Sequence, residues 1–474
     1  MKGANEMKMK GSVRTMIRSL VAGSALSALA GAAQAQTEVL FTFDTEDFTN
    51  PRSADGVKAL ADLFTSEGIT AHFMVVGFEA RALVQWGRYD AIEAMKPHLK
   101  CTHTLMHSVH PNSTEVSETE DISAALDVLR ARETLAAGMI LSATGADRLW
   151  GACVPGCSES AAMYYAWAEL GLPFYMGPYY ANNTPGDDVW FCNLRHIPYS
   201  FSWEVFWRPD YKPDPAKFVD RVAACKRAIV YCHPNRVYGK EFWDILNYKG
   251  ANNCEWGKWK LTEEHTEAES KAYLDFMRSC LRLFKRDPRF KITTAAELDK
   301  TRKPRQAIRR GDVPAIRASL AKTFGPVRAP ASWSLADCFI AAVRFLRGDE
   351  EHLPGFVYGF ARTPKGVAAP VSVKATDLVA AAKAMDVSGF LPTEIRVGAT
   401  TLGPADFLFA ALEALETGKD EIVVTPREQR GGFGPYPAME KMSLKGRWLH
   451  APDFEDKYVS ESIRNQIWTL RYED

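Results

Sequence analysis

Three of the chain's ten histidines, His103, His107 and His110, lie within eight consecutive positions. An acidic run, Asp44-Thr-Glu46-Asp47, lies upstream of them. Imidazole is the commonest protein ligand of catalytic divalent ions. A catalytic zinc typically has three protein ligands, drawn from histidine and carboxylate, and one position open to water. Two histidines and one carboxylate complete that set, so the sequence predicts a divalent-metal site in which zinc is the expected ion.

The spacing of the histidines offers two overlapping pairs. His103 and His107 are four residues apart and can lie on one face of a helical turn, where both rings reach the same ion. His107 and His110, three residues apart, form a second candidate pair. The alternative is that all three rings only make hydrogen bonds within a loop. We favour His103 and His107 as the ligands and expect His110 beside the site, facing the substrate.

Short apolar runs would deliver these groups and a further histidine. Residues 39–43 are apolar, β-branched or aromatic, which predicts a buried strand with Asp44 at its carboxyl end. A helix that begins near Ser53 and stops at Gly68, followed by a strand over 69–76, completes a β-α-β unit. A later strand over 228–232 ends at His233. Catalytic groups of α/β barrels lie at the carboxyl ends of the strands, which is where Asp44 and His233 are expected.

The alternation of strands and helices continues through the first two thirds of the chain. It adds helices over 122–135, 160–170, 217–224 and 266–284 and strands over 174–176 and 290–293. This pattern predicts a parallel barrel or a doubly wound sheet, and the chemical groups at several strand ends favour a distorted (β/α) barrel. We assign the barrel to residues 36–299, a basic, polar linker to 300–331, and a smaller, mainly helical domain to 332–474. The helices of that domain recur with a period of about 40 residues.

The first 35 residues have the pattern of a secretory signal peptide. Lys8, Lys10, Arg14 and Arg18 precede an apolar run over 20–33, and the small-x-small sequence Ala33-Gln-Ala35 follows. A membrane anchor is the weaker alternative, because the run is shorter than the roughly 20 residues that cross a bilayer. We therefore expect cleavage after Ala35 and a secreted or periplasmic protein with no membrane span after cleavage.

Composition narrows the partners and the cysteine chemistry. The 58 basic and 58 acidic residues balance, so nucleic acid is not an expected partner. Nine cysteines in an exported protein can form disulfides, but an odd number cannot all pair within one chain. Cys153 and Cys157 can close a small loop or pair elsewhere, and the sequence leaves the connectivity open.

Residues 39–298 resemble the polysaccharide deacetylase family, a group of metal-dependent carbohydrate esterases. Phe41-Thr-Phe-Asp44 matches the family's strand that ends in a catalytic aspartate, and His103-Thr-Leu-Met-His107 matches its His-Ser/Thr-x-x-His metal pair. Val230-Tyr-Cys-His233-Pro234 matches a late strand that carries a histidine. The resemblance implies that Asp44 and His233 are catalytic and that a divalent metal is the cofactor.

The resemblance also implies a mechanism. The metal would hold the acetamide carbonyl and lower the pKa of the attacking water, while Asp44 accepts the proton of that water. His233 would protonate the leaving amine, and a backbone amide within 154–157 would help to stabilise the oxyanion. The alternative for His233 is a structural histidine that ends its strand before Pro234.

Two positions depart from the family's pattern. Thr45 stands where the family has a second aspartate, so we expect Glu46, one step on, to be the carboxylate ligand. Cys153, in Cys153-Val-Pro-Gly156, stands where the family has the arginine that orients the base. Either the catalytic site is a variant, or it is a degenerate site that only binds.

Aromatic residues crowd the stretch between residues 164 and 207. Sugar rings pack on aromatic faces, so we predict Trp190 and Trp203 as substrate-binding residues together with His110. Packing in the core is the alternative for both tryptophans.

Residues 332–415 have a faint resemblance to pseudomurein-binding repeats, through helices that precede Leu-Pro-x-x-Ile/Val units. A helical module that packs on the barrel is the alternative. The leading hypothesis for the whole chain is an exported deacetylase of an amino-sugar polymer whose partner is a polysaccharide or cell-wall glycan. Two further hypotheses are a catalytically degenerate, glycan-binding relative and a metal-dependent hydrolase of a non-sugar amide.

Overall fold

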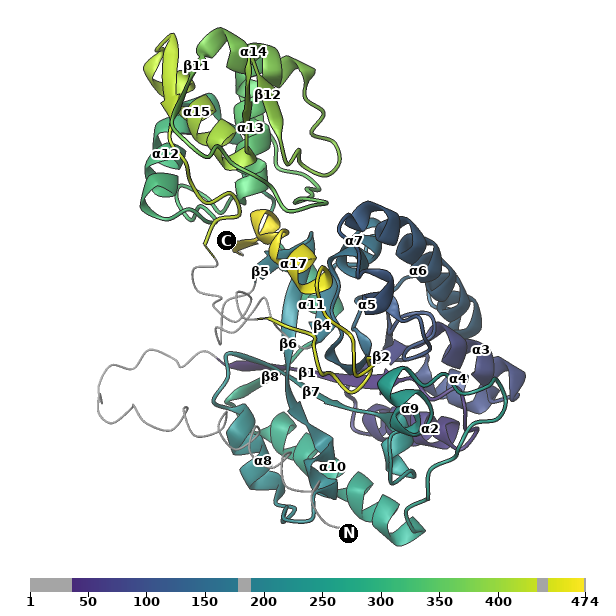
Figure 1. Cartoon of the computed structure of the whole chain (residues 1–474). Coiled ribbons are helices and arrows are strands. Elements are labelled where there is room, and N and C mark those ends of the chain that lie inside the picture. The colour runs from purple at the N-terminus through teal and green to yellow at the C-terminus, as the bar shows by residue number, and fades with distance from the viewer. Residues whose placement is uncertain (1–35, 178–188, 433–441, 473–474) are drawn as a thin grey trace. The chain divides into compact units, whose positions relative to one another are not determined.

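The computed structural model describes residues 36–177, 189–432 and 442–472 (Figure 1). The predicted signal peptide, residues 1–35, lies outside the described residues, and export stays a prediction. Within the described part of the chain, no helix combines the length and the apolar character needed to cross a membrane.

The predicted distorted (β/α) barrel is confirmed by a closed ring of parallel strands. The neighbours along the ring are β4 (Phe174–Gly177), β6 (Leu194–Ser202), β7 (Arg227–Cys232), β1 (Thr37–Thr45), β2 (His72–Val75) and β3 (Leu99–Thr102). Ala152 closes it, because this residue forms one parallel bridge to Thr102 in β3 and another to Tyr175 in β4. The carboxyl ends of all these strands therefore meet at one end of the barrel.

Central strand β1 explains why the barrel forms around this part of the sequence. Eight of its nine residues are buried, as expected of a parallel strand that is covered on both faces. Its aromatic side chains pack on helix α2 (Ser53–Ser66), where Phe43 meets Phe64 at a centroid distance of 4.9 Å. Strand β8 (Phe290–Ile292) pairs with the first three residues of β1, beside β7.

Helices cover the outside of the strands (Figure 1). They are α2, α3 (Gly77–Gln85), α4 (Tyr89–Met95), α5 (Ser113–Val116), α6 (Ile122–Thr144), α7 (Ala161–Glu169), α8 (Pro215–Val222), α9 (Trp243–Tyr248), α10 (Glu267–Arg286) and α11 (Ala295–Lys300). The boundaries follow local chemistry: Thr266 and Glu269 form a capping box at the start of α10. Gly145 ends α6 in the left-handed conformation that glycine adopts without strain.

Two further strands extend the sheet beyond the ring. Strand β5 (Val189–Phe191) pairs antiparallel with β6, and β15 (Arg471–Tyr472) pairs antiparallel with β5. The end of the chain, which the sequence assigned to the C-terminal domain, therefore joins the sheet of the barrel. A two-residue strand has no periodicity that a sequence pattern could reveal.

The segment predicted to be a linker is structured in part. It contains β9 (Ile308–Arg309) and α12 (Val313–Lys322), and the side chains of Val313, Ile316 and Leu320 are buried. After it come helices α13 (Leu335–Arg347), α14 (Ala375–Ala384), α15 (Pro404–Thr417) and α17 (Val459–Arg464). Three short antiparallel pairs accompany them: β9 with β10 (Glu351–His352), β11 (Val371–Lys374) with β14 (Glu421–Val424), and β12 (Ile395–Val397) with β13 (Thr400–Leu402). The division into a barrel and a C-terminal domain stays a prediction.

The cysteines are thiols in this structure. The eight whose side chains are described, at 101, 153, 192, 225, 232, 254, 280 and 338, are free. Cys153 is 1% exposed and lies inside the barrel wall.

Candidate metal centre

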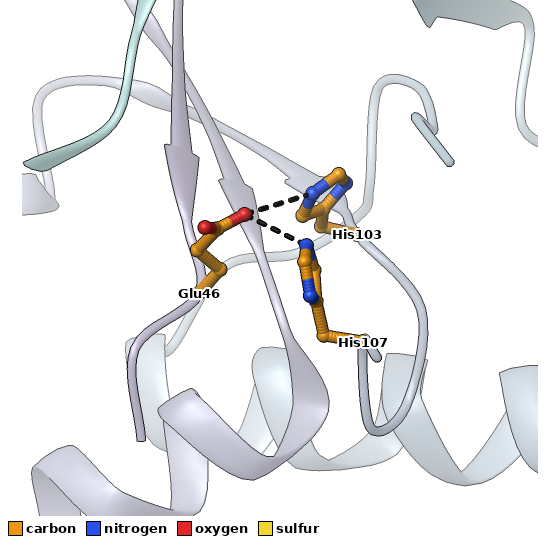
Figure 2. Close-up of side chains that lie close together, drawn as sticks. All are labelled: Glu46, His103 and His107. Carbon is orange, nitrogen blue, oxygen red and sulfur yellow. Dashed lines mark ion pairs between the residues drawn. The ribbon is translucent and has the colours of Figure 1, made fainter. Parts of the chain in front are cut away.

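The three residues predicted as metal ligands lie together at the carboxyl end of the barrel (Figure 2). Glu46 directly follows β1, and His103 directly follows β3. The Oε2 atom of Glu46 lies 2.8 Å from Nε2 of His107 and 3.3 Å from Nε2 of His103. All three residues are buried, at 5% exposure or less. One carboxylate oxygen and two imidazole nitrogens therefore converge on one point.

The backbone that carries the histidine pair differs from the prediction. The two residues were expected on a helical turn, but residues 103–107 form a tight loop. Thr104 and His107 have φ of 70° and 51°, a left-handed conformation that is strained for residues other than glycine. The amide of His107 donates to Oγ1 of Thr104 at 3.1 Å, which helps to hold the loop. The four-residue spacing identified the right pair, while the loop brings the ring centroids to 4.8 Å.

Hydrogen bonds behind the two rings fix which nitrogen faces the centre. Nδ1 of His103 lies 3.1 Å from the carbonyl oxygen of Cys153 and donates to it. Nδ1 of His107 lies 2.7 Å from Oγ of Ser108, which donates to Oδ2 of Asp244 at 3.1 Å. Such contacts orient metal-binding histidines and leave Nε2 free for the ion. The sequence gave no signal for Ser108 or Asp244.

Glu46 is held as a carboxylate with one oxygen committed elsewhere. Nε1 of Trp243 donates to Oε1 at 3.0 Å, so Oε2 faces the histidines. Burial raises the pKa of Glu46, but His107, His233 and His103 together lower it well below its ordinary value. The position therefore presents a negative charge at neutral pH.

These donors fit a divalent ion. The Nδ1 proton of His107 is committed to Ser108, so the 2.8 Å contact between Nε2 and Glu46 requires either a second ring proton or a cation. A buried carboxylate and two neutral imidazoles form a ligand set that zinc prefers, with one position left for water. Glu46, His103 and His107 would hold the ion.

The affinity of this site for metal should depend on pH. Burial lowers the pKa of His107, but Glu46 and Asp244 raise it above the ordinary value of 6.5. The ion must displace that proton, so below the pKa of His107 we expect the zinc affinity to fall about tenfold for each unit of pH. Zinc titrations against a competing chelator at about pH 8 and about pH 5.5 would measure this. Equal affinity at both values would contradict a histidine ligand.

Asp44, the predicted base, is oriented by a tyrosine. It lies in β1 two residues before Glu46, and its Oδ1 accepts a hydrogen bond of 2.7 Å from Oη of Tyr199 in β6. Burial, with Asp44 and Cys153 nearby, raises the pKa of Tyr199 well above its ordinary value, so the phenol keeps its proton and donates. Tyr199 therefore orients the aspartate in a chain that has Cys153 where the family arginine was expected.

His233 follows β7 and faces Asp44. Its Nε2 lies 3.5 Å from Oδ2 of Asp44, and its Nδ1 lies 2.6 Å from Oε1 of Glu204. The Glu204 oxygen also accepts from the backbone amide of His233 at 2.9 Å. Burial lowers the pKa of His233, but Glu204, Glu46 and Asp44 raise it to about 10. His233 is therefore an imidazolium at neutral pH, with Glu204 behind it.

The structure does not bring His110 to the centre. Its Nδ1 lies 2.9 Å from both carboxylate oxygens of Glu115, and its Nε2 lies 3.0 Å from the carbonyl oxygen of Tyr248. Both ring nitrogens are engaged in holding the loop, so the expected substrate-facing position is wrong.

The two tryptophans predicted to bind substrate are core residues. Trp203 is fully buried and stacks on Phe218, with ring centroids 4.9 Å apart. Trp190 is 3% exposed, and the guanidinium groups of Arg302 and Arg471 lie 4.4 Å and 4.6 Å from its ring. Neither ring has a face open to a glycan, which corrects the prediction. Composition alone cannot distinguish a buried indole from an exposed one.

The core role of Trp203 predicts a large effect on stability. Truncation to alanine would leave a cavity in the barrel, so the free energy of unfolding should fall by about 3–5 kcal/mol. Denaturant unfolding of the Trp203→Ala variant would measure the loss. Leu261→Ala is the control, because Leu261 is 59% exposed and should change stability by less than about 0.5 kcal/mol. Equal stability of the two variants would contradict the core assignment.

Comparisons with known proteins return structures alone. No protein-family model and no curated protein sequence matches the chain. A family 4 carbohydrate esterase from Streptomyces lividans in complex with acetate shares 11% identity, over 55% of this chain and 94% of its own, with a TM-score of 0.32. The values for peptidoglycan deacetylase PdaC from Bacillus subtilis are 13%, 56%, 91% and 0.30. For a CE4 family pseudoenzyme from Bacillus anthracis they are 14%, 42%, 55% and 0.27. Likeness at this level carries no argument about activity, and the account of the site rests on its geometry.

Proposed function

We propose that this protein is an exported, metal-dependent hydrolase that removes N-acetyl groups from an amino-sugar polysaccharide. One observation carries the proposal: Glu46 Oε2 lies between the Nε2 atoms of His103 and His107, while Asp44 and His233 face each other at the same end of the barrel. This arrangement combines a metal site with a carboxylate and an imidazolium. Amide hydrolysis needs those three elements.

The chain's own residues have separable roles in this reaction. A bound divalent ion would supply the polarisation of the amide carbonyl and a lower pKa for water. Asp44, held by Tyr199, would accept the proton of the attacking water. His233, held by Glu204, carries the proton that the leaving amine needs. A backbone amide within 154–157 would donate to the oxyanion, as the resemblance implies.

The roles of Asp44 and His233 follow from their surroundings. Acid and base catalysis requires two groups whose environments keep one protonated and the other not. Glu204 and its neighbours raise the pKa of His233 to about 10, although burial acts in the opposite direction. His233 is thereby suited to donate a proton and Asp44 to accept one.

The substrate class, the compartment and the C-terminal domain belong to the proposal. An amino-sugar polymer of a cell wall is the expected substrate, because the motifs around Asp44, His103 and His233 resemble those of polysaccharide deacetylases. The predicted signal peptide implies a secreted or periplasmic enzyme that meets such a polymer directly. The C-terminal domain would help to hold the glycan.

Acetate release tests the proposal. The full-length protein loaded with zinc should release acetate from N-acetylated chitooligosaccharides or peptidoglycan fragments, and His103→Ala should release none. His110→Ala is the matched control, because its ring lies outside the centre and activity should persist. Bound zinc without acetate from any glycan would refute deacetylation of a sugar. It would instead favour hydrolysis of a non-sugar amide or a site that only binds.

A further inference from the structure

An exposed tryptophan lies beside the metal centre and has no role in the hydrolysis described above. Trp256, in the segment that follows α9, exposes 54% of its surface. The five largest fully buried side chains of the described residues are also tryptophans, so the exposure of this one is a departure from how the chain uses indoles. An exposed, rigid aromatic face is typical of a binding site.

Three other rings hold the Trp256 indole in place. Phe48 stacks against it, with centroids 5.8 Å apart and the planes 13° apart. Phe78 and Trp259 meet it edge to face, at 5.5 Å and 4.8 Å. Phe48 is itself buried at 2% exposure, so the stack rests on the core. A ring that is already fixed loses little conformational entropy when a ligand binds.

A series of direct contacts joins this ring to a metal ligand. Trp243 donates a hydrogen bond of 3.0 Å to Glu46. Phe48 packs on Trp243 at a centroid distance of 4.8 Å, and Trp256 stacks on Phe48. Phe48 also follows Glu46 by two residues along the chain. The exposed indole therefore lies at the same end of the barrel as the metal centre.

We propose that Trp256 is a sugar-stacking subsite that holds a pyranose ring of the glycan next to the sugar whose N-acetyl group is removed. A pyranose has an apolar face of C–H groups that packs on an indole, while its hydroxyl groups point outward. Glu255 and Lys258, on either side of Trp256 in the sequence, are each 69% exposed and pair at 2.8 Å. Their charges cancel, so the surroundings of the ring are polar and neutral, which suits an uncharged sugar. This inference rests on the proposed function, because the metal centre makes a glycan the expected occupant.

Direct binding tests the subsite without relying on catalysis. The full-length protein would carry Asp44→Asn, so that sugar is not consumed, and calorimetry would measure the Kd for the hexamer of N-acetylglucosamine. Adding Trp256→Ala should raise that Kd about tenfold, and Trp256→Tyr should restore most of the affinity, because tyrosine keeps an aromatic face. Leu261→Ala, an equally exposed apolar residue of the same segment, should leave the Kd unchanged.

The outcomes separate this inference from the proposed function. An unchanged Kd in Trp256→Ala overturns the subsite even if the native protein releases acetate. A raised Kd with no acetate release by the native protein supports the subsite and refutes the hydrolysis. No hexamer binding by any variant overturns the subsite. If Trp256→Ala instead dissociates a dimer in sedimentation and leaves the Kd unchanged, the indole is an interface between copies and the subsite is overturned.

Discussion

Replacing His107 with alanine is expected to weaken zinc binding at least about 100-fold and to abolish acetate release. The variant removes one of two nitrogens that lie within 3.3 Å of the Glu46 carboxylate oxygen. It also leaves Ser108 and Asp244 without the ring that they orient. Zinc titration against a chelator measures the affinity, and the zinc content after dialysis gives the stoichiometry.

His110→Ala is the matched control for this prediction. His110 belongs to the same loop, but its ring nitrogens contact Glu115 and the carbonyl oxygen of Tyr248 rather than Glu46. The variant should keep one equivalent of zinc, although the loop loses hydrogen bonds. Equal loss of zinc in the two variants would mean that the loop, and not the pair, holds the metal. Full zinc binding by His107→Ala would remove this residue from the ligand set.

Replacing Asp44 with asparagine should lower kcat by about 100-fold to 10,000-fold and leave the zinc content unchanged. Asparagine keeps the size of the side chain and can still accept the hydrogen bond from Tyr199, but it cannot take a proton from water. Acetate release under saturating substrate measures kcat, and metal analysis shows that the centre is intact.

Asp47→Asn is the control, because the same chemical change falls in the same acidic run. The Oδ1 atom of Asp47 accepts from Oγ1 of Thr49 at 2.6 Å and from its amide at 3.0 Å, and asparagine preserves that acceptor. Activity should therefore persist in the control. If Asp44→Asn retains full activity while Asp47→Asn loses it, the base has been misassigned.

The sequence predicted the parts of the centre that lie on strongly patterned strands. The apolar run before Asp44 and the one before His233 became β1 and β7, which pair along six residues. Parallel pairing brings the carboxyl ends of strands together, so Asp44 and His233 had to be near each other once the barrel was inferred. The histidine spacing identified the pair that meets Glu46.

The supporting residues could not be predicted, because the elements that carry them have weak patterns. Strand β6 reads Leu-Arg-His-Ile-Pro-Tyr-Ser-Phe-Ser, in which a proline and several polar residues interrupt any apolar run. Tyr199 reaches Asp44 only because β6 pairs with β7 in the barrel. Glu204, in the 3-10 helix η3 (Trp203–Trp207), reaches His233 for the same reason.

The aromatic residues show a second limit of sequence reasoning. Trp190 and Trp203 lie in a crowded aromatic stretch and were expected to form a glycan-binding wall, but tertiary packing buries both. Trp256 lies in a polar segment with no aromatic pattern, yet its ring is the exposed one beside the centre. Burial depends on contacts between distant segments, here between Phe48 and Trp256, and these contacts leave no periodic trace in the chain.

The account depends most directly on a metal ion at Glu46, His103 and His107. Anomalous diffraction at the zinc edge, from crystals of the zinc-loaded protein, would locate that ion. The expected result is one peak about 2.0–2.2 Å from a Glu46 carboxylate oxygen and from the Nε2 atoms of both histidines. A zinc-containing crystal whose peaks all lie away from these three residues would contradict the account.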